Sequence, residues 1–294
     1  MKNMNMKKIW AMLLALTMIL SLAACGSKKE TPAPETEKPA AEQPAETPAA
    51  EPAEESDLDY IKGKGSMTIG YTVYAPMNYT DDNGEFTGFD TELAQMVCEK
   101  LGVEPNFQEI DWGTKEVELA GKSIDCIWNG MTLDAEREAN MNCTQPYVKN
   151  AQVVVVKKGT EYTDTSSLIG KTVVAEIGSA GEAQILGGED AEPDANLAQA
   201  DYVGKSVQTD CLMEVKAGTA TAAVLDMTLA NAMIGEGTDY ADLEIVDELA
   251  IENYGVAFRK GSDVRDAVNA IFDELVADGS LGALSEKYGL ELAD

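Results

Sequence analysis

A stretch that combines a strand, a loop and a helix start lies at residues 124–137, with the sequence IDCIWNGMTLDAER. The apolar residues from Ile124 to Trp128 predict a buried strand, and Arg137 lies within one helical turn of the polar loop that follows. A guanidinium binds a carboxylate through two parallel charge-assisted hydrogen bonds, and free N–H groups at a helix start attract the same anion. The stretch therefore predicts a carboxylate-binding site at the end of a strand.

Residues 1–24 have the features of a secretory signal peptide. Three lysines lie within the first eight residues, and an apolar run from Ile9 to Leu20 follows. This run is short for the roughly 20 residues that cross a membrane. The next residues, Leu22-Ala23-Ala24-Cys25, resemble the lipobox of bacterial lipoproteins, in which the cysteine becomes the acylated first residue. We therefore expect a palmitate-type lipid anchor on Cys25 and a folded part at the outer face of the cell membrane.

Residues 25–56 are expected to form the lipidated N-terminus and a disordered linker. Between residues 30 and 56 there are six of the ten prolines and eight glutamates, and there is no aromatic or branched aliphatic side chain. Such a segment cannot bury enough apolar surface to offset the loss of chain entropy on folding. It is predicted to tether the domain that follows.

Residues 57–294 are enough for one large domain or two lobes with proper cores. Patterns of strand and helix alternate along them, which predicts the α/β class. The formal net charge is −30, which argues against nucleic-acid binding because phosphate recognition needs a basic surface. The sequence has no histidine, so Ser-His-Asp and Cys-His nucleophiles and the commonest metal ligand are excluded. We expect a monomer without cofactor or metal.

Four cysteines follow Cys25, at positions 98, 126, 143 and 211, and none forms a Cys-x-x-Cys pair. A zinc or redox site therefore has no local support. Cys98 and Cys126 fall in predicted regular elements, where cysteine usually behaves as a small buried apolar residue. In an exported protein a Cys126–Cys143 disulfide remains open from the sequence.

Periodicity and turn residues predict the order of elements. Strands are expected at Met67–Tyr71, Phe107–Ile110, Ile124–Trp128, Gln152–Val156, Thr172–Glu176, Ala222–Leu225, Leu243–Val246 and Tyr254–Phe258. Helices are expected after a capping Asp90 up to Gly102, at Thr114–Ala120, from Gly178-Ser179-Ala180-Gly181, at Val207–Lys216, Asp226–Met233 and Asp263–Val276, and near Leu284.

Ligands in open α/β sheets bind beyond the carboxyl ends of strands. Three loops have that position here: Trp128 to Arg137, Glu176 to Gly181, and the one at Asp226. Arg137 is suited to bind a carboxylate, and Asp226 is suited to accept hydrogen bonds from an ammonium group. The N–H groups around Thr132 and Ser179 could donate further hydrogen bonds to the ligand. A free α-amino acid carries that pair of charges.

Each of these residues also has an ordinary structural interpretation that the sequence leaves open. Asp226 is well placed as a helix N-cap, and the Gly178–Gly181 segment as a strand-to-helix turn. Trp112 and Trp128 suit a core as well as a ligand wall. The same ambiguity holds for Tyr71 and Tyr74.

Several ordered motifs resemble the extracellular solute-binding proteins of polar amino-acid ABC transporters, the family of the glutamine- and histidine-binding periplasmic proteins. They are Gly88-Phe89-Asp90 with Leu101-Gly102, Ile124-Asp125 with Gly130-Met131-Thr132, Glu136-Arg137 with Gln145-Pro146-Tyr147, Gly255 to Gly261, and Asp278-Gly279-Ser280. The resemblance spans about residues 60 to 290. It implies a type II periplasmic-binding-protein-like fold, with mixed sheets flanked by helices in two lobes and a two-strand hinge. Lobe one would comprise residues 57–151 and 252–294, and lobe two residues 152–251.

The resemblance also implies roles for individual residues. Arg137 would hold the ligand carboxylate, with Thr132 and Gly130 beside it and Ser179 donating from lobe two. Asp226 would accept from the α-ammonium group. Trp112 and Tyr74 would form aromatic walls around the ligand.

Departures from the family pattern bear on the choice of ligand. The first strand is followed by Tyr71-Thr72-Val73-Tyr74, without the aspartate that contacts basic side chains or amide ligands in some relatives. Trp128 and Asn129 add bulk and an amide at a strand end, so we expect the side-chain preference near them. Lys115 stands where an apolar residue is more typical; we interpret it as a solvated lysine on a short helix, with contact to an acidic ligand side chain as the alternative. Lysine, arginine and histidine are disfavoured, and glutamine, glutamate or cystine are the first choices.

The implied function is capture of a free polar amino acid and its delivery to ABC permease subunits by hinge closure, without catalysis. Two alternatives remain open. The same fold serves dehydratases such as cyclohexadienyl dehydratase, for which Glu176 would be the acid–base group. The domain could also sense amino acids for a separate membrane partner.

Overall fold

The computed structural model of the protein describes residues 56–188 and 191–294. The predicted signal peptide, Cys25 and all but the last residue of the predicted linker lie outside these residues. In the described part, one mixed sheet has the strand order β4-β1-β5-β11-β7-β10-β8-β9, with β6 also paired to β11. Strands β2 and β3 form a separate hairpin.

The strands are β1 (Ser66–Tyr71), β2 (Tyr79–Thr80), β3 (Phe86–Thr87), β4 (Glu104–Glu109), β5 (Cys126–Thr132), β6 (Asn142–Cys143), β7 (Val148–Lys157), β8 (Thr172–Glu176), β9 (Asp201–Lys205), β10 (Ala222–Asp226) and β11 (Leu243–Phe258). The α-helices are α1 (Asp57–Lys64), α2 (Phe89–Leu101), α3 (Lys115–Ala120), α4 (Ala135–Asn140), α5 (Ala180–Leu186), α6 (Gln208–Ala217), α7 (Met227–Met233), α8 (Val264–Ala277) and α9 (Ser280–Tyr288). Short 3-10 helices lie at Trp112–Thr114, Thr165–Leu168 and Leu197–Gln199.

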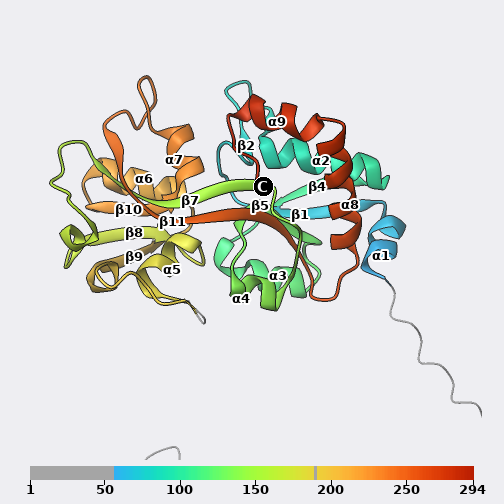
Figure 1. The fold of residues 1–294 in the computed structure, drawn as a ribbon, viewed down its shortest axis with the longest axis horizontal. Coiled ribbons are helices and arrows are strands. Elements are labelled where there is room, and N and C mark those ends of the chain that lie inside the picture. The colour runs from blue at the N-terminus through green and yellow to red at the C-terminus, as the bar shows by residue number, and fades with distance from the viewer. Residues whose placement is uncertain (1–55, 189–190) are drawn as a thin grey trace, which may run out of the picture. The chain divides into compact units, whose positions relative to one another are not determined.

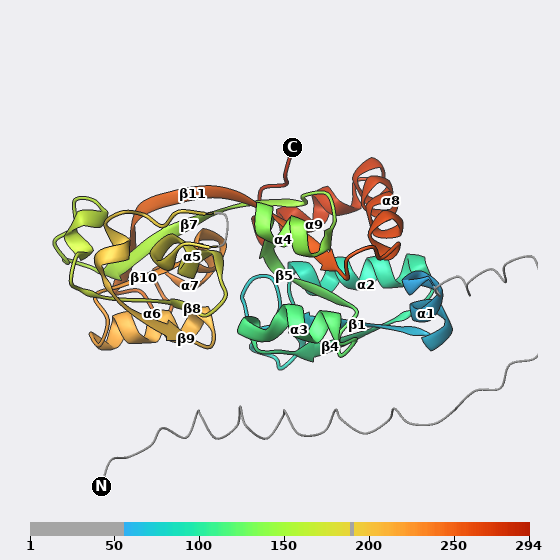
Figure 2. The ribbon, with the colours of Figure 1, turned by 90° about the horizontal axis from the view of Figure 1, so that it is seen from below.

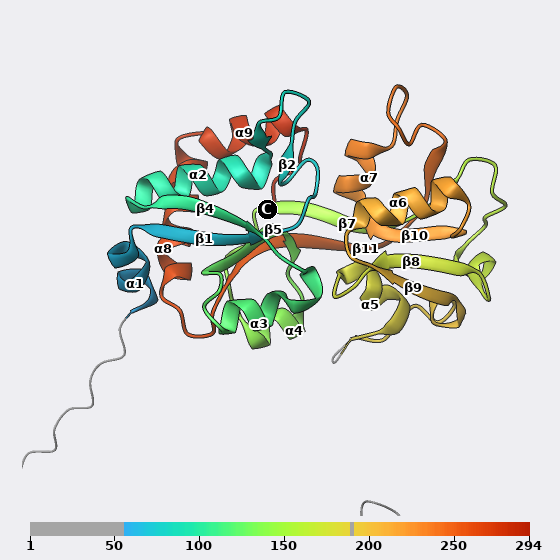
Figure 3. The ribbon, with the colours of Figure 1, turned by 180° about the vertical axis from the view of Figure 1, so that it is seen from behind.

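Strands β7 and β11 pass from one lobe to the other, and Figures 1 and 2 show both strands spanning the two groups of elements. They pair antiparallel from Leu243↔Lys157 to Tyr254↔Val148. The lobe with β1, β4 and β5 carries α2, α8 and α9 on one face of its sheet and α3 and α4 on the other (Figures 1 and 3). The second lobe has α6 and α7 on one face and α5 on the other. The α/β two-lobe prediction is thereby confirmed.

Each face of the sheet has its own apolar core. Residues such as Phe89, Trp128 and Phe272 belong to the cluster beneath α2 and α8, whereas Leu119 and Ile127 belong to the cluster beneath α3. Neighbouring residues of β5 thus face opposite cores, as the two-residue period of a strand requires. Full burial of side chains of this size stabilises the fold by about 1.5–3 kcal/mol each.

Strand β11 corrects one expectation. The sequence predicts two strands, Leu243–Val246 and Tyr254–Phe258, but the structure has one strand from Leu243 to Phe258. Its middle residues are exposed or half-buried, and the pairing with β7 shifts register twice, between Ile245 and Asp247 and between Glu248 and Ala250. A strand that crosses between lobes lacks the covered face that gives a clear apolar alternation.

Asp90 corrects a second expectation, because it does not cap helix α2. The N-cap is Gly88, which has no side chain to contribute. The Asp90 carboxylate is buried and accepts hydrogen bonds from the Gly130 N–H at 2.6 Å and the Tyr147 hydroxyl at 3.0 Å. Burial raises the pKa of Asp90 to about 7.

The four cysteines between residues 56 and 294 are free thiols. Cys126 is buried beside β1 and Cys143 is partly buried, and no disulfide joins them in the structure. Over the described residues, no helix has the length and apolarity that crossing a membrane requires.

Candidate functional site

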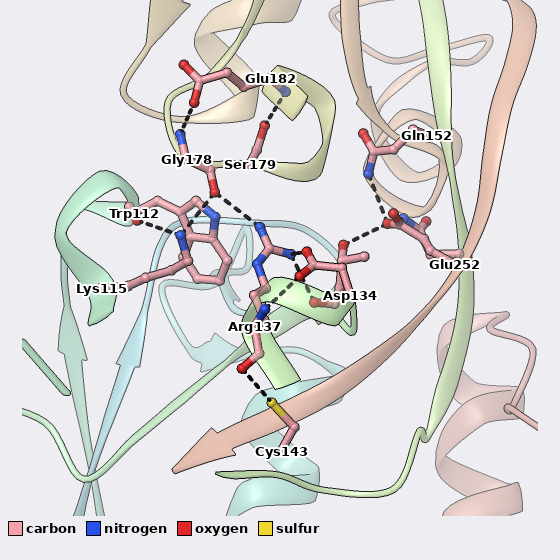
Figure 4. Close-up of polar contacts among 12 residues, drawn as sticks. Trp112, Lys115, Asp134, Arg137, Cys143, Gln152, Gly178, Ser179, Glu182 and Glu252 are labelled. Atoms are coloured by element: carbon pink, nitrogen blue, oxygen red, sulfur yellow. Dashed lines mark hydrogen bonds and ion pairs between the residues drawn. The ribbon is translucent and has the colours of Figure 1, made fainter. Parts of the chain in front are cut away.

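A buried cavity lies between the two lobes, where β5, β8 and β10 end. It encloses about 10 Å³, roughly the space of one water molecule. Its walls contain Tyr74, Trp112, Asn129, Gly130, Thr132 and Arg137 from lobe one, and Glu176, Ser179, Ala180, Gln208 and Asp226 from lobe two. Eight of the ten ligand-binding residues predicted from the sequence therefore converge on it. Figure 4 shows polar contacts around Arg137 and Lys115, in the lobe-two loop at Gly178 and Ser179, and at the hinge residue Glu252.

Arg137 lies in the first turn of helix α4. Asp134 caps helix α4 by accepting from the Arg137 N–H at 2.8 Å, and its other carboxylate oxygen lies 3.4 Å from the guanidinium. The guanidinium donates to the Thr132 carbonyl at 2.9 Å and, across the lobes, to the Gly178 carbonyl at 3.1 Å (Figure 4). A buried cation with a fixed plane is suited to binding a carboxylate.

Asp226, at the end of β10, carries the opposite charge. Its carboxylate accepts from the Asn150 and Gln152 amides, each at 2.7 Å, and from the Gln208 amide. It makes no capping bond to helix α7, although it occupies the N-cap position. Burial raises the pKa of Asp226 above its usual range. The helix-cap interpretation is therefore wrong, and the carboxylate is part of an amide-lined site.

Glu252 of the hinge strand β11 belongs to the same network and was missed from the sequence. Its carboxylate accepts from the Thr132 hydroxyl at 2.9 Å, from Asn150 at 2.7 Å and from Gln152 at 2.9 Å. Burial and the charge of Asp226 raise the pKa of Glu252 to about 8. The available signal was the polar pair Asn150 and Gln152, spaced by two residues in a valine-rich strand.

Glu176 ends β8 and lines the same cavity. Its side chain is buried, and one carboxyl oxygen, Oε1, has no hydrogen-bond partner among the described residues. Burial and the nearby Asp226 raise the pKa of Glu176 to about 8. A buried polar atom without a partner is rare in folded proteins, and a ligand at this site would satisfy it.

Lys115 does not line this cavity but a neighbouring pocket, which Arg137 and Gly178 also line. The interpretation as a solvated lysine is wrong, because its side chain is buried. Its ammonium group donates to the Trp112 carbonyl at 3.2 Å and to the Gly178 carbonyl of lobe two at 3.0 Å, and it lies 4.9 Å from the Trp112 ring centroid (Figure 4). Burial, together with the charge of Arg137, lowers the pKa of Lys115 to about 8.

Comparison with known proteins shows the family of this chain. Residues 67–291 match the family described as bacterial extracellular solute-binding proteins, family 3. The chain belongs to this family. The L-cystine-binding protein TcyJ of Escherichia coli strain K12 is 30% identical over 241 residues, which cover 80% of this chain and 87% of that protein.

Solved structures of other proteins are also similar to this chain. Holo ArgBP from T. maritima has a TM-score of 0.66 and 31% identity, with 74% of this chain and 93% of that chain covered. The ancestral amino acid-binding protein AncCDT-1, a precursor of cyclohexadienyl dehydratase, has a TM-score of 0.70 and 27% identity, with 79% and 99% covered.

In this solute-binding protein the lobe-two loop is anchored by its own helix. Ser179 caps α5 by accepting from the Glu182 N–H at 3.0 Å, and the Glu182 carboxylate accepts from the Gly178 N–H at 2.7 Å. The two bonds form a capping box, which fixes the loop whose Gly178 carbonyl faces Arg137 and Lys115. The Ser179 hydroxyl is thus partly committed to the helix, while its residue still lines the cavity.

Tyr74 and Gly130 meet at the cavity wall. The Tyr74 hydroxyl lies 2.5 Å from the Tyr254 hydroxyl, and both rings are buried. Gly130 has φ +57, and a Cβ there would lie 2.8 Å from the Tyr74 ring and 3.0 Å from the Tyr254 ring. Only glycine fits this position without displacement of an aromatic wall.

Trp128 and Tyr71, which were expected at the ligand, do not line the cavity. Trp128 points into the core, where its ring lies 5.8 Å from that of Phe272. The Tyr71 ring packs 4.8 Å from Phe86.

Asn129 lines the cavity, but its amide is fully used inside lobe one. It donates to the Thr72 carbonyl at 2.9 Å and to Asn78 at 2.8 Å, and it accepts from the Thr72 N–H and hydroxyl. These bonds hold the loop after β1 against β5. Trp128 lies in the core and does not line the cavity, which corrects the expectation for that residue. Asn129 lines the cavity, and its role in reading the ligand side chain stays a prediction.

Proposed function

We propose that this protein captures a free polar amino acid outside the cell and delivers it to the permease subunits of an ABC transporter. The observation that carries the proposal is the pair Arg137 and Asp226, a buried cation and a buried carboxylate on the walls of one interlobe cavity. An α-amino acid presents the matching carboxylate and ammonium groups. Membership of the solute-binding family and similarity to amino-acid-binding proteins support the same conclusion.

Binding requires the lobes to separate. The cavity holds about 10 Å³, which is too small for an amino acid. The lobes in the proposal comprise residues 57–151 with 252–294, and residues 152–251, and they rotate about β7 and β11. Arg137 and Thr132 bind the carboxylate with Gly130 beside them, and closure brings Ser179 and Asp226 onto the ligand. Trp112 and Tyr74 cover it.

The first test is calorimetry on an Arg137→Ala variant, with the ligand chosen by a thermal-shift screen of the common amino acids and cystine. A ligand that binds only the folded state raises the melting temperature. We expect Kd to rise about 100-fold or more in the variant, because the ligand carboxylate is left buried and unpaired. Unchanged affinity would contradict the assigned role of Arg137.

The location of the protein belongs to the same proposal. Cleavage before Cys25 and acylation of that cysteine would hold the domain at the outer face of the membrane. A Cys25→Ala variant expressed in cells is expected to lose labelling by radioactive palmitate and to appear in the culture medium. Labelling that persists in this variant would contradict the anchor.

Glu176 supports a second candidate function, a dehydratase acting on a small cyclic carboxylate. Its buried carboxyl group lines the cavity and has a pKa of about 8, so it holds a proton near neutral pH, as a general acid must. AncCDT-1 relates this fold to cyclohexadienyl dehydratase. Incubation with prephenate or arogenate separates the two functions: transport predicts no product, whereas product that disappears in Glu176→Gln establishes the enzyme.

A further inference from the structure

The carboxyl groups of Asp226 and Glu252 are joined through two shared amide donors. The Asn150 amide nitrogen donates to Asp226 Oδ1 and to Glu252 Oε1, at 2.7 Å each. The Gln152 amide nitrogen donates to the same two oxygens, at 2.7 Å and 2.9 Å, and Figure 4 shows it reaching Glu252. Two oxygens bound to one nitrogen can be no further apart than the sum of the two bonds. Asp226 of lobe two and Glu252 of the hinge are therefore close neighbours.

The surroundings fix the direction in which the Asn150 and Gln208 amides donate. Asn150 Oδ1 accepts from the Thr228 N–H at 3.0 Å and from the Thr228 hydroxyl at 2.8 Å, so the Asn150 NH₂ group must face the two carboxyl groups. Gln208 Oε1 accepts from the Asp226 N–H at 3.0 Å, which turns its NH₂ group toward Asp226 Oδ2. The protein therefore surrounds this carboxyl pair with neutral donors.

No cation in the described part of the chain pairs with either carboxyl group. Arg137 lines the same cavity as Asp226, but its guanidinium is paired with Asp134. The side chains that contact the pair from β5, β7 and α6 are uncharged: Thr132, Asn150, Gln152 and Gln208. The titratable groups that face it from β8, from β11 and from the loop after β1 are Glu176, Tyr254 and Tyr74.

Two buried carboxyl groups in such surroundings cannot both ionise without a large cost. Burial raises the pKa of each group, and the charge of Asp226 adds to this effect at Glu252, whose pKa is raised to about 8. Neighbouring carboxyl groups of this kind lose their protons in two steps that belong to the pair. The empty site therefore keeps one proton on the pair near neutral pH.

We propose that Glu252 is a positioning residue that shares a proton with Asp226 in the empty site, and that the ammonium group of the captured amino acid takes the place of this proton. The inference rests on the proposed function of amino-acid capture. On binding, the carboxyl O–H bond breaks and the proton passes to the solvent. An ammonium group with the same charge enters, so the charge of the site is unchanged. Glu252 acts through Asp226, which lines the cavity.

The exchange makes amino-acid affinity depend on pH. At low pH the proton competes with the ammonium group, so affinity should rise as the pH rises toward the pKa of the pair. We expect Kd to fall about 3- to 10-fold from pH 6 to pH 7. In Glu252→Gln the amide oxygen can keep the three hydrogen bonds that Oε1 accepts, but Asp226 no longer has a neighbour with which to share a proton. The change in Kd over this range should then shrink to about 2-fold or less.

The test counts protons by calorimetry at pH 7 in phosphate and in Tris, two buffers that differ in their heat of ionisation. The probe is whichever of the common amino acids and cystine raises the melting temperature most. The wild type should release about 0.5–1 proton more per bound amino acid than Glu252→Gln does. Ionisation of the probe itself is the same in both proteins and cancels in this comparison. Glu248→Gln, at an exposed residue of the same strand, is the matched control and should behave like the wild type.

Three results would overturn the inference and leave amino-acid capture intact. The first is binding to the wild type without proton release. The second is weaker binding to Glu252→Gln at every pH with unchanged proton release, which would show a structural role only. The third is release that is lost in Glu176→Gln but kept in Glu252→Gln, which would assign the proton to Glu176. A thermal-shift screen in which no amino acid stabilises the protein would instead overturn the proposed function.

Infrared difference spectroscopy gives a second readout that does not depend on the folding of Glu252→Gln. Addition of the same amino acid at pH 7 should remove the carbonyl stretch of a protonated carboxyl group, in the wild type and in Glu176→Gln alike. A spectrum in which this band persists after binding would overturn the exchange of a proton for an ammonium group.

Discussion

Arg137 and Asp226 are positioned by their own surroundings, which reduces the cost of ordering them when a ligand binds. Carbonyl groups and Asp134 hold the guanidinium, and three side-chain amides hold the carboxylate. These protein groups provide the two charged side chains with the hydrogen bonds that water would provide at an exposed position. Such preorganisation raises affinity because less freedom is lost on binding.

We expect Asp226→Asn to weaken amino-acid binding without destabilising the ligand-free protein. The variant cannot pair with an ammonium group, so we expect amino-acid affinity to fall about 30-fold or more. The pKa of Asp226 is raised in the fold, which means that the ionised carboxylate destabilises the ligand-free protein near neutral pH. The midpoint of thermal unfolding without ligand should therefore stay the same or rise. A lower midpoint together with unchanged affinity would contradict this role.

The residues at the site differ in how far the sequence predicts them. Asp226 directly follows a predicted strand, and Ser179 and Arg137 lie at the helix starts after predicted strands, so the positions of these residues come from local pattern. Glu252 joins the site network only through the pairing of β11 with β7, and the buried position of Lys115 depends on its contact with Gly178 of lobe two. Trp128 was expected at the ligand but lies in the core. Successive side chains of β5 point to opposite faces, so a one-residue step decides whether a side chain faces the core or the cavity.

At the scale of elements, β5 contributes residues both to the apolar core and to the site. The strand continues to Thr132, four residues beyond the predicted end at Trp128, because its polar end pairs with β11 at Tyr254↔Thr132. Its glycine lets two aromatic side chains approach the backbone. Apolar pattern predicts the apolar half of this strand and not the polar half that lines the site, although both halves are buried.

Gly130→Ala should damage both folding and binding. An L-residue with a left-handed backbone costs about 1–2 kcal/mol, and the added methyl group must displace Tyr74 or Tyr254. We expect the free energy of unfolding to fall by about 2–4 kcal/mol in urea titrations. Gly282→Ala in helix α9 is the matched control: nothing lies within 4 Å of its Cβ, and the change should be neutral or stabilise by up to about 1 kcal/mol. Equal effects of the two substitutions would contradict the constraint at Gly130.

At the scale of the whole molecule, the fold buries several carboxyl groups. Burial raises the pKa values of Asp90 to about 7 and of Glu176 and Glu252 to about 8. The folded protein therefore holds protons on these groups at pH values where the unfolded chain has released them. Ionising them in the fold costs stability.

Ligand-free protein should accordingly lose stability as the pH rises from about 5 to 8. The loss begins above the ordinary carboxyl pKa values and ends near pH 8, and we expect at least about 2 kcal/mol in urea unfolding. Lys115, whose pKa is lowered to about 8, acts in the opposite direction only above that pH. Glu176→Gln should flatten the slope, whereas Glu99→Gln should leave it unchanged. Constant stability across this range would contradict the burial of ionisable groups described here.

The central claim is recognition of a free zwitterion by Arg137 and Asp226, and blocking either end of the ligand tests it most directly. Calorimetry would compare the best ligand from the amino-acid and cystine screen with its N-acetyl and methyl-ester forms. The clamp predicts that each blocked form binds about 100-fold more weakly or not at all, because one buried charge is left unpaired. Equal affinity for the free amino acid and either blocked form would contradict the account.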